Sequence, residues 1–230
     1  MNLLVFDIDG TLTRTDFADH QIFLEAFREK ISPDIRSIEE LKLKNNTDNG
    51  DTFELYQLFH GRNPDKEELN SIIQLVVDKF RNLSMVHPEC FAAIDGASEL
   101  IRHFLNEEKE RWNLCMATGC WLESALFKLN ISGLYRSEIP LATSDQLFSK
   151  AEIILSAVEK AGRKNYVSNY DKIVYVGDSY TDLQASLYLK IGFIGIQAEN
   201  NDHKRKLLGK YCKLENFKDI EVFKKILESL

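Results

Sequence analysis

The sequence is poor in cysteine, in proline and in long hydrophobic runs. Its 230 residues include four cysteines and four prolines, which excludes a disulfide-stapled secreted scaffold and a collagen-like chain. No apolar run approaches the roughly 20 residues of a membrane-spanning helix. The short run that ends at Asp7 has no basic leader, so we expect neither a membrane span nor a secretory signal. Cysteines without a paired spacing are typical of reduced proteins, and we expect a cytoplasmic location.

Basic residues are also fewer than acidic ones. The chain has 29 lysines and arginines against 36 aspartates and glutamates, which gives a net charge of −7. Because nucleic-acid binding depends on clustered basic residues, we expect no nucleic-acid partner. A small phosphorylated molecule needs only a local positive pocket and is compatible with this charge. The remaining composition, 44% hydrophobic and 28% charged residues, is typical of a globular protein.

Short apolar runs alternate with helical patterns along most of the chain. The first run, from Asn2 to Ile8, is continuous and ends in acidic residues, as a buried parallel strand does. This alternation predicts an α/β fold with a doubly wound, mainly parallel sheet, whose carboxyl ends form one ligand-binding edge. Further strands are expected at 114–117, 139–142, 173–176 and 193–196, and helices at 97–107, 121–130, 149–161 and 180–190.

Residues from about 14 to 90 contain helical patterns only. They are expected near 17–30, 35–43, 51–60 and 65–84. This stretch is too long to be a loop in a compact domain. We therefore expect a core domain formed by residues 1–13 and 92–230, and a second, all-helical domain formed by residues 14–91, called the insert below.

Acidic residues follow the first strand, in the sequence Asp7-Ile8-Asp9-Gly10-Thr11. Side chains alternate along a strand, so Asp7 and Asp9 are expected on the same side. Two close carboxylates raise each other's pKa, and a hard divalent ion such as Mg²⁺ would compensate their charge. Gly10 permits a tight turn, which Thr11 can hold by a hydrogen bond. An ordinary solvated turn is the alternative.

A second acidic cluster follows the strand expected at 173–176. Asp178 comes at the end of this strand, and Asp182 lies one helical turn later on the same face. If the first strand is a neighbour, Asp178 would reach Asp7 and Asp9. Helix capping by Asp178 is the alternative.

Two further positions could hold an anion. Thr118 and Gly119 end the strand expected at 114–117 and precede a helix, so a hydroxyl and backbone N–H groups could cradle an anion there. Lys150 stands at the start of a helix, where a cation opposes the helix dipole and therefore suggests an anionic partner. A helix-capping threonine and a solvated surface lysine are the alternatives.

Taken in order, these segments resemble the four motifs of the haloacid dehalogenase (HAD) superfamily. The matching segments are DIDGT at 7–11, ATG at 117–119, Lys150, and GDSYTD at 177–182. The resemblance covers essentially the whole chain, and it implies a Rossmann-like HAD core. The insert is similar to the helical C1 cap of phosphoglycolate phosphatase and β-phosphoglucomutase relatives. One departure is Ala151, where the family often has proline.

The resemblance implies a role for each motif residue. Asp7 would be the nucleophile that becomes an aspartyl-phosphate, and Asp9 the general acid and then the base that activates water. Mg²⁺ would be held by Asp7, by the backbone carbonyl of Asp9 and by Asp178, while Asp182 would support the metal or orient the motif lysine. The full prediction assigns catalysis to Asp7, Asp9, Thr118 and Lys150, phosphate contacts to Gly10, Thr11, Thr118, Gly119 and Lys150, and metal ligation to Asp7, Asp9, Asp178 and Asp182.

Substrate choice is expected to depend on the insert. The segment from Asn45 to Thr52 resembles the substrate-specificity loop of the family, with Thr47 and Asn49 as candidate substrate contacts. A loop that merely caps the following helix is the alternative. Lys42 lies nearby and could meet an anionic substrate tail.

We therefore expect a Mg²⁺-dependent phosphatase that hydrolyses a small phosphomonoester, phosphoglycolate or phosphosugar-like, through an aspartyl-phosphate. The acid at position 9 favours phosphate esters, because an alkoxide leaving group needs a proton and a halide does not. A phosphosugar mutase would share every core residue. A non-enzymatic signalling module that phosphorylates an aspartate is disfavoured, because such receivers are much shorter. A silent binding protein on the same scaffold is a further alternative, and the sequence indicates no oligomeric state.

Overall fold

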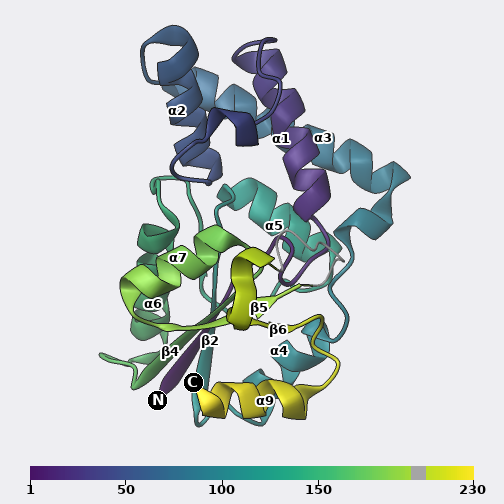
Figure 1. Cartoon of the computed structure of the whole chain (residues 1–230). Coiled ribbons are helices and arrows are strands. Elements are labelled where there is room, and N and C mark those ends of the chain that lie inside the picture. Colours follow the sequence, from purple (N-terminus) through teal and green to yellow (C-terminus); the bar gives the residue numbers. More distant parts are fainter. Residues whose placement is uncertain (198–205) are drawn as a thin grey trace.

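A six-stranded sheet forms the centre of the protein. The structure, a computed structural model, describes residues 1–197 and 206–230. All neighbouring strands in this part of the chain run parallel, in the order β3-β2-β1-β4-β5-β6 (Figure 1). The strands are β1 (Asn2–Phe6), β2 (Trp112–Ala117), β3 (Leu141–Ala142), β4 (Lys172–Gly177), β5 (Gly192–Ile196) and β6 (Cys212–Leu214).

The central strand β1 lies where the chain order of the strands reverses. Phe6 pairs with Met116 of β2 and with Val176 of β4, so these three strands end level with one another. β1 is shorter than the predicted 2–8, because the chain turns at Gly10, whose φ of 70° lies in the left-handed region that favours glycine. Open α/β sheets bind ligands at such a reversal, outside the carboxyl ends of the strands.

Helices cover both faces of the sheet, as the doubly wound prediction requires. They are α4 (Ala97–Asn106) and α9 (Ile220–Ser229) on one face, and α6 (Lys150–Asn165) and α7 (Tyr180–Leu189) on the other. Alternate side chains of β1 point to opposite faces. Leu4 and Phe6 lie in a hydrophobic cluster with α4 and α9, whereas Leu3 and Val5 lie in a second cluster with α6 and α7. The predicted α/β fold class is confirmed.

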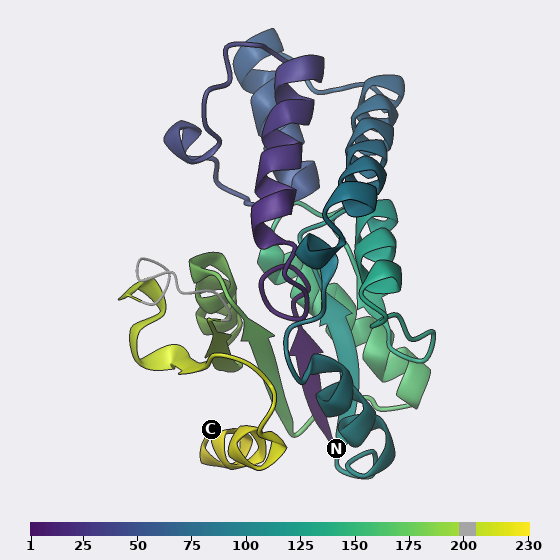
Figure 2. The same cartoon turned by 90° about the vertical axis from the view of Figure 1, so that its right-hand side faces the viewer.

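The insert lies beyond the carboxyl end of the sheet (Figures 1 and 2). Its long helices are α1 (Asp16–Lys30), α2 (Asp48–His60) and α3 (Lys66–Val86). A third hydrophobic cluster gathers side chains from these helices, including Phe27, Tyr56 and Phe80. Trp121, which directly precedes α5 (Leu122–Ile131), joins the same cluster. The insert therefore has apolar contacts of its own and packs onto the start of α5.

The two segments that connect the insert to the sheet run side by side. The Arg14 N–H donates to the Ala92 carbonyl at 2.9 Å, and the Ile94 N–H donates to the Leu12 carbonyl at 2.8 Å. The predicted domain boundaries fall on this pair of segments. The division into two domains stays a prediction.

The helix predicted at 35–43 is wrong. Only the short 3-10 helix η1 (Glu39–Leu41) forms there. The Arg28 guanidinium binds the carbonyl oxygens of Ile35 and Arg36, at 2.6 and 2.8 Å, which a helix would need as acceptors. A long-range side-chain contact thus replaces the local helical hydrogen bonds.

The elements after residue 205 have no counterpart in the prediction. β6 has only three residues, too few for a clear hydrophobic pattern. The side chains of Phe223 and Leu227 in α9, one turn apart, are buried against the sheet. The other short 3-10 helices are η2 (Pro88–Phe91) and η3 (Gly209–Tyr211). Among the helices described, none combines the length and hydrophobicity needed to cross a bilayer.

Candidate active site

Three acidic side chains from the two predicted clusters meet at the carboxyl end of the sheet. Carboxylate oxygens of Asp7, Asp178 and Asp182 lie within 4.8 Å of one another, and all three residues are buried. The level ends of β1 and β4 cause this, since the Asp7 N–H continues the ladder by donating to the Val176 carbonyl at 2.9 Å. Asp178 approaches the turn so closely that a Cβ atom on Gly10 would lie 2.3 Å from its Oδ2.

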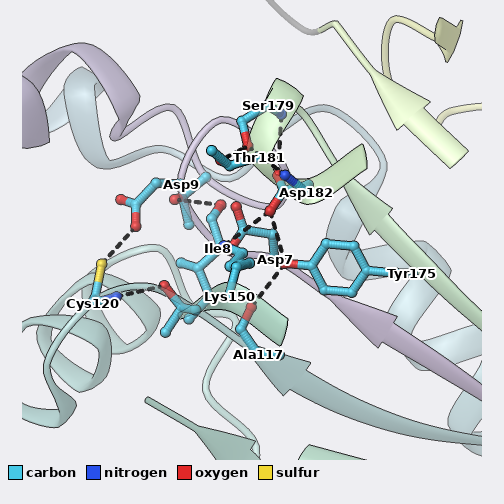
Figure 3. A network of polar contacts seen from close by, with 12 residues as sticks. Asp7, Ile8, Asp9, Ala117, Cys120, Lys150, Tyr175, Ser179, Thr181 and Asp182 are labelled. Atoms are coloured by element: carbon cyan, nitrogen blue, oxygen red, sulfur yellow. Dashed lines mark hydrogen bonds and ion pairs between the residues drawn. The ribbon is translucent and has the colours of Figure 1, made fainter. Parts of the chain in front are cut away.

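Lys150 places its ammonium group inside this acidic cluster. It begins α6, after a capping box formed by Ser149 and Glu152. Its Nζ lies 2.8 Å from Oδ1 of Asp7 and 3.1 Å from Oδ1 of Asp182 (Figure 3). Its side chain is only 10% exposed. Lys150 is therefore not a solvated surface lysine.

Asp182 is held on both of its oxygens. Oδ1 accepts a hydrogen bond from the Tyr175 hydroxyl at 3.2 Å in addition to its contact with Lys150. Oδ2 accepts from the backbone N–H of Ser179 at 3.1 Å. The Tyr175 hydroxyl also lies 3.1 Å from the Ala117 carbonyl oxygen (Figure 3). These contacts suit Asp182 to orienting Lys150, the second of the two roles expected for it.

The charges in this cluster do not balance. Burial raises the pKa of Asp7 well above its usual value, Lys150 opposes this shift, and Asp182 and Asp178 add to it. Burial lowers the pKa of Lys150, but the two neighbouring carboxylates outweigh burial and raise it. Three buried carboxylates around one ammonium group leave an excess of negative charge. A hard divalent cation with oxygen ligands, such as Mg²⁺, fits this donor set.

The Asp9 carboxylate lies outside this cluster. Its Oδ1 is 2.7 Å from Lys128 Nζ and also accepts a hydrogen bond from the Thr15 hydroxyl. Its Oδ2 accepts a hydrogen bond from the Cys120 thiol at 2.9 Å (Figure 3). Burial raises the pKa of Asp9, but Lys128 and the hydrogen bonds outweigh burial and lower it. A metal contact from Asp9 would therefore come from its backbone carbonyl, as the sequence prediction had it.

The predicted phosphate-binding residues differ in how accessible they are. Thr118 and Gly119 line the cavity described below. The Thr118 N–H is engaged with the Ala142 carbonyl at 3.0 Å, and its hydroxyl accepts from the Cys120 N–H at 3.2 Å. Thr11 is fully buried, and its hydroxyl has no hydrogen-bond partner among the described residues. Gly10 and Thr11 are not among the lining residues, so their phosphate contacts stay predictions.

The insert loop before α2 docks on the core. The Thr47 hydroxyl donates to the Phe148 carbonyl at 2.7 Å and accepts from the Gly50 N–H at 3.1 Å, which makes Thr47 the cap of α2. The Asn49 side chain donates to the Leu147 carbonyl at 3.5 Å. Thr47 lines the cavity and Asn49 does not. The capping alternative thus applies to Thr47, and a substrate contact from either residue stays a prediction.

A cavity of about 330 Å³ separates the sheet edge from the insert. Asp7, Asp9, Asp178 and Lys150 line it from the core side. The insert side contributes more acids than bases. Its charged or ionisable lining residues are Asp16, Asp19, His20, Lys42, Asp48 and Asp51.

Lys128 is the main polar residue that the sequence analysis missed. It lies on the buried face of α5, together with Ser124, Ala125 and Leu129, and is fully buried itself. A lysine among the apolar positions of a predicted helix was the signal available, because lysine is almost never fully buried without a partner. Its partners come from distant parts of the chain, so the sequence alone did not reveal them.

Comparisons with known proteins bear on the family and the fold. The family model for haloacid dehalogenase-like hydrolases matches residues 1–187. A hydrolase from Pseudomonas syringae is similar in structure, with a TM-score of 0.71 and 19% identity over 100% of this chain and 99% of that one. A candidate β-phosphoglucomutase from Bacteroides vulgatus has a TM-score of 0.66 and 19% identity, covering 100% and 89% of the two chains.

A third similar structure is CbbY from Rhodobacter sphaeroides, solved in complex with phosphate. Its TM-score is 0.63 at 18% identity, and the match covers 95% of each chain. No curated protein sequence matches the chain. At these identities the solved structures establish a shared fold.

Proposed function

Because the chain belongs to the haloacid dehalogenase-like hydrolases, we propose that it is a Mg²⁺-dependent phosphatase that forms an aspartyl-phosphate at Asp7. The observation that carries this proposal is the 2.8 Å contact between Lys150 Nζ and Asp7 Oδ1, beside the carboxylates of Asp178 and Asp182. A carboxylate nucleophile, a fixed ammonium group and oxygen ligands for a divalent ion are the groups that phosphoryl transfer requires.

The metal would be held by the carboxylates of Asp7 and Asp178 and by the backbone carbonyl of Asp9. When bound, Mg²⁺ would supply positive charge next to the phosphoryl oxygens. Asp182 would act mainly through Lys150, because its oxygens are already engaged by Lys150, Tyr175 and Ser179. Lys150 and Thr118 would bind the phosphoryl oxygens on which negative charge accumulates in the transition state.

The reaction would proceed in two halves. In the first, a carboxylate oxygen of Asp7 bonds to phosphorus and the bond from phosphorus to the ester oxygen breaks. Asp9, whose pKa is lowered by Lys128 and by its hydrogen bonds, would take up a proton as the anionic substrate binds beside it and give this proton to the ester oxygen. In the second, Asp9 takes a proton from water, and the water oxygen bonds to phosphorus. The bond from phosphorus to Asp7 then breaks, which releases inorganic phosphate and regenerates the carboxylate.

The lining of the cavity favours one of the two predicted substrate classes. Phosphoglycolate carries a carboxylate besides its phosphate, and four aspartates of the insert face the cavity against Lys42 and His20. With few cations among these lining groups, a second anionic group on the substrate would be poorly compensated. An uncharged, hydroxyl-bearing leaving group, as in a phosphosugar, would instead donate hydrogen bonds to carboxylates. We therefore favour a phosphosugar-like metabolite as the substrate, in a protein that we still expect to be cytoplasmic.

The test is inorganic phosphate release from a panel of phosphomonoesters, with Mg²⁺ and with EDTA. We expect turnover only with the metal, and a labelled aspartyl-phosphate in rapid-quench samples. Asp7→Asn is expected to abolish both signals, by more than about 1,000-fold, because it removes the nucleophile. Full activity in Asp7→Asn, or turnover in EDTA, would reject the mechanism. Isomerised sugar phosphate without net phosphate release would identify the mutase instead.

A further inference from the structure

Lys128 is an unusual residue for the place it occupies. It lies in the last turn of α5, and its side chain is 0% exposed. Taking an ammonium group out of water costs several kcal/mol unless ion pairs and hydrogen bonds compensate it. A lysine at such a position therefore needs strong partners, and here they are Asp9, Asp19 and Cys120.

Among the described residues, the Lys128 ammonium has three polar partners. Its Nζ is 2.7 Å from Asp9 Oδ1, donates a hydrogen bond to Asp19 Oδ1, and lies 3.2 Å from Cys120 Sγ. An ammonium group has three hydrogens to donate, so these contacts satisfy it fully. Asp9, Asp19 and Cys120 have the spacing of metal ligands. The Lys128 Nζ contacts all three, so it takes the place that a cation would have among them.

The partners of Lys128 belong to both parts of the molecule. Asp9 follows β1 and belongs to the proposed catalytic residues. Asp19 lies on α1 of the insert. The Phe80 ring, on α3 of the insert, has its centroid 4.7 Å from Lys128 Nζ, within the range of a cation–π contact. One ammonium group thus connects the Asp9 carboxylate with two helices of the insert.

The same contacts leave Asp9 little freedom to rotate. Lys128 and the Thr15 hydroxyl bind its Oδ1, and the Cys120 thiol binds its Oδ2. Lys128 is the charged member of this set, and charge-assisted contacts are the strongest. An acid–base group must point at the proton it transfers, so whatever holds this carboxylate influences the transfer.

We propose that Lys128 is a positioning residue that orients the Asp9 carboxyl for proton transfer and, through Asp19, couples that orientation to the insert. This inference rests on the function proposed above. Lys128 would not touch the phosphoryl group, whose oxygens are assigned to Lys150 and Thr118. Its loss would therefore impair protonation of the leaving group more than attack on phosphorus.

Two substrates of nearly equal size separate these effects. The p-nitrophenolate ion leaves without a proton, whereas the alkoxide of p-nitrobenzyl phosphate needs one. Single-turnover release of the alcohol, with enzyme in excess, reports only the first half-reaction. In Lys128→Met we expect a loss of about 100-fold with p-nitrobenzyl phosphate and less than about 5-fold with p-nitrophenyl phosphate, because general acid catalysis contributes at least about 100-fold.

Two further variants guard against a protein that does not fold. Lys128→Met leaves the buried carboxylates of Asp9 and Asp19 without their cation. Lys128→Met/Asp19→Asn also removes the negative charge of Asp19, so that less uncompensated charge is buried. The double variant should show the same dependence on the leaving group. Asp19→Asn alone keeps the contact between Lys128 and Asp9, and we expect an intermediate loss of about 10-fold with the benzyl ester, in kcat rather than KM.

Lys224→Met is the matched control. Lys224 lies on α9 and pairs with Glu108 at 3.1 Å, away from the lining of the cavity. We expect Lys224→Met to release the alcohol from both substrates at the wild-type rate. Equal losses with the two substrates in Lys128→Met and in the double variant would show a purely structural lysine and overturn the inference. Wild-type protein that releases neither alcohol in the presence of Mg²⁺ would instead refute the proposed function.

Discussion

Two buried lysines bind the two aspartates of the first motif, and they differ in what else they hold. Lys150 lies between Asp7 and Asp182, with N–O distances of 2.8 and 3.1 Å. Lys128 lies between Asp9, at 2.7 Å, and Asp19. Lys150 therefore joins segments of the α/β core alone, whereas Lys128 joins the core to the insert.

The two lysines also leave their aspartates in different electrostatic states. Burial raises the pKa of Asp7 well above its usual value even with Lys150 beside it, because two further carboxylates are close. Burial acts on Asp9 as well, but Lys128 and the hydrogen bonds outweigh it and lower the pKa. Asp7 therefore needs additional positive charge nearby to be ionised and act as a nucleophile. Asp9 needs no further cation to be ionised, because its pKa is already lowered. We therefore expect the divalent cation to bind beside Asp7.

The largest effect is expected from Lys150→Met. Lys150 is proposed to act on the phosphoryl oxygens, so its loss should slow single-turnover alcohol release by about 1,000-fold with p-nitrophenyl and p-nitrobenzyl phosphate alike. Lys160→Met is the control on the same helix, because Lys160 is exposed and donates to the Leu141 carbonyl at 2.9 Å, away from the lining of the cavity. A loss confined to the benzyl ester would mean that Lys150, like Lys128, affects protonation of the leaving group and not the phosphoryl oxygens.

The difference between the lysines also explains what the sequence could predict. Lys150 follows a strand and begins a helix, and its position in an ordered set of motifs indicated an anionic partner. Asp7 and Asp178 were expected to meet because parallel neighbouring strands end at one edge, and the structure brings them together. The α/β sheet and the family followed from the same periodic pattern and motifs.

Features that depend on contacts between distant segments were not predictable in this way. Lys128 is bound by residues 109 and 119 positions away in the chain, Asp19 and Asp9. The helix expected at 35–43 is lost to the Arg28 guanidinium, which takes its carbonyl acceptors. In both cases a contact with a side chain outside the segment decides the local structure. The spacing of residues within one segment cannot predict such a contact.

A smaller effect is expected on stability from the coupling of Lys128 to Asp19. Removing one partner of a buried ion pair leaves an uncompensated charge, which costs about 3 kcal/mol or more. Lys128→Met should lower the free energy of unfolding in urea by about that amount, and Lys128→Met/Asp19→Asn by clearly less. Additive losses in the double variant would show that the two residues are not coupled, and the link between core and insert would fail.

The smallest effect is expected from Asp51, an acid on the insert side of the cavity whose pKa is shifted mainly by burial. Burial and the neighbouring Glu54 raise the pKa of Asp51 from 3.8 to about 7. The folded protein therefore binds a proton at Asp51 between about pH 4 and pH 7 that the unfolded chain has released. The stability that this proton contributes is fully present below pH 4 and is lost as the pH rises through 7.

Asp51→Asn should remove this loss, because the amide does not titrate. We expect the difference in unfolding free energy between Asp51→Asn and wild type to shift in favour of the variant from pH 5 to pH 8, measured by urea titration at each pH. Asp78→Asn, on the exposed face of α3, is the control, since Asp78 is exposed and forms a surface pair with Arg81 at 2.8 Å. A constant difference across this range would mean that Asp51 is ionised in the folded protein at low pH. Burial would then not keep the Asp51 carboxyl protonated.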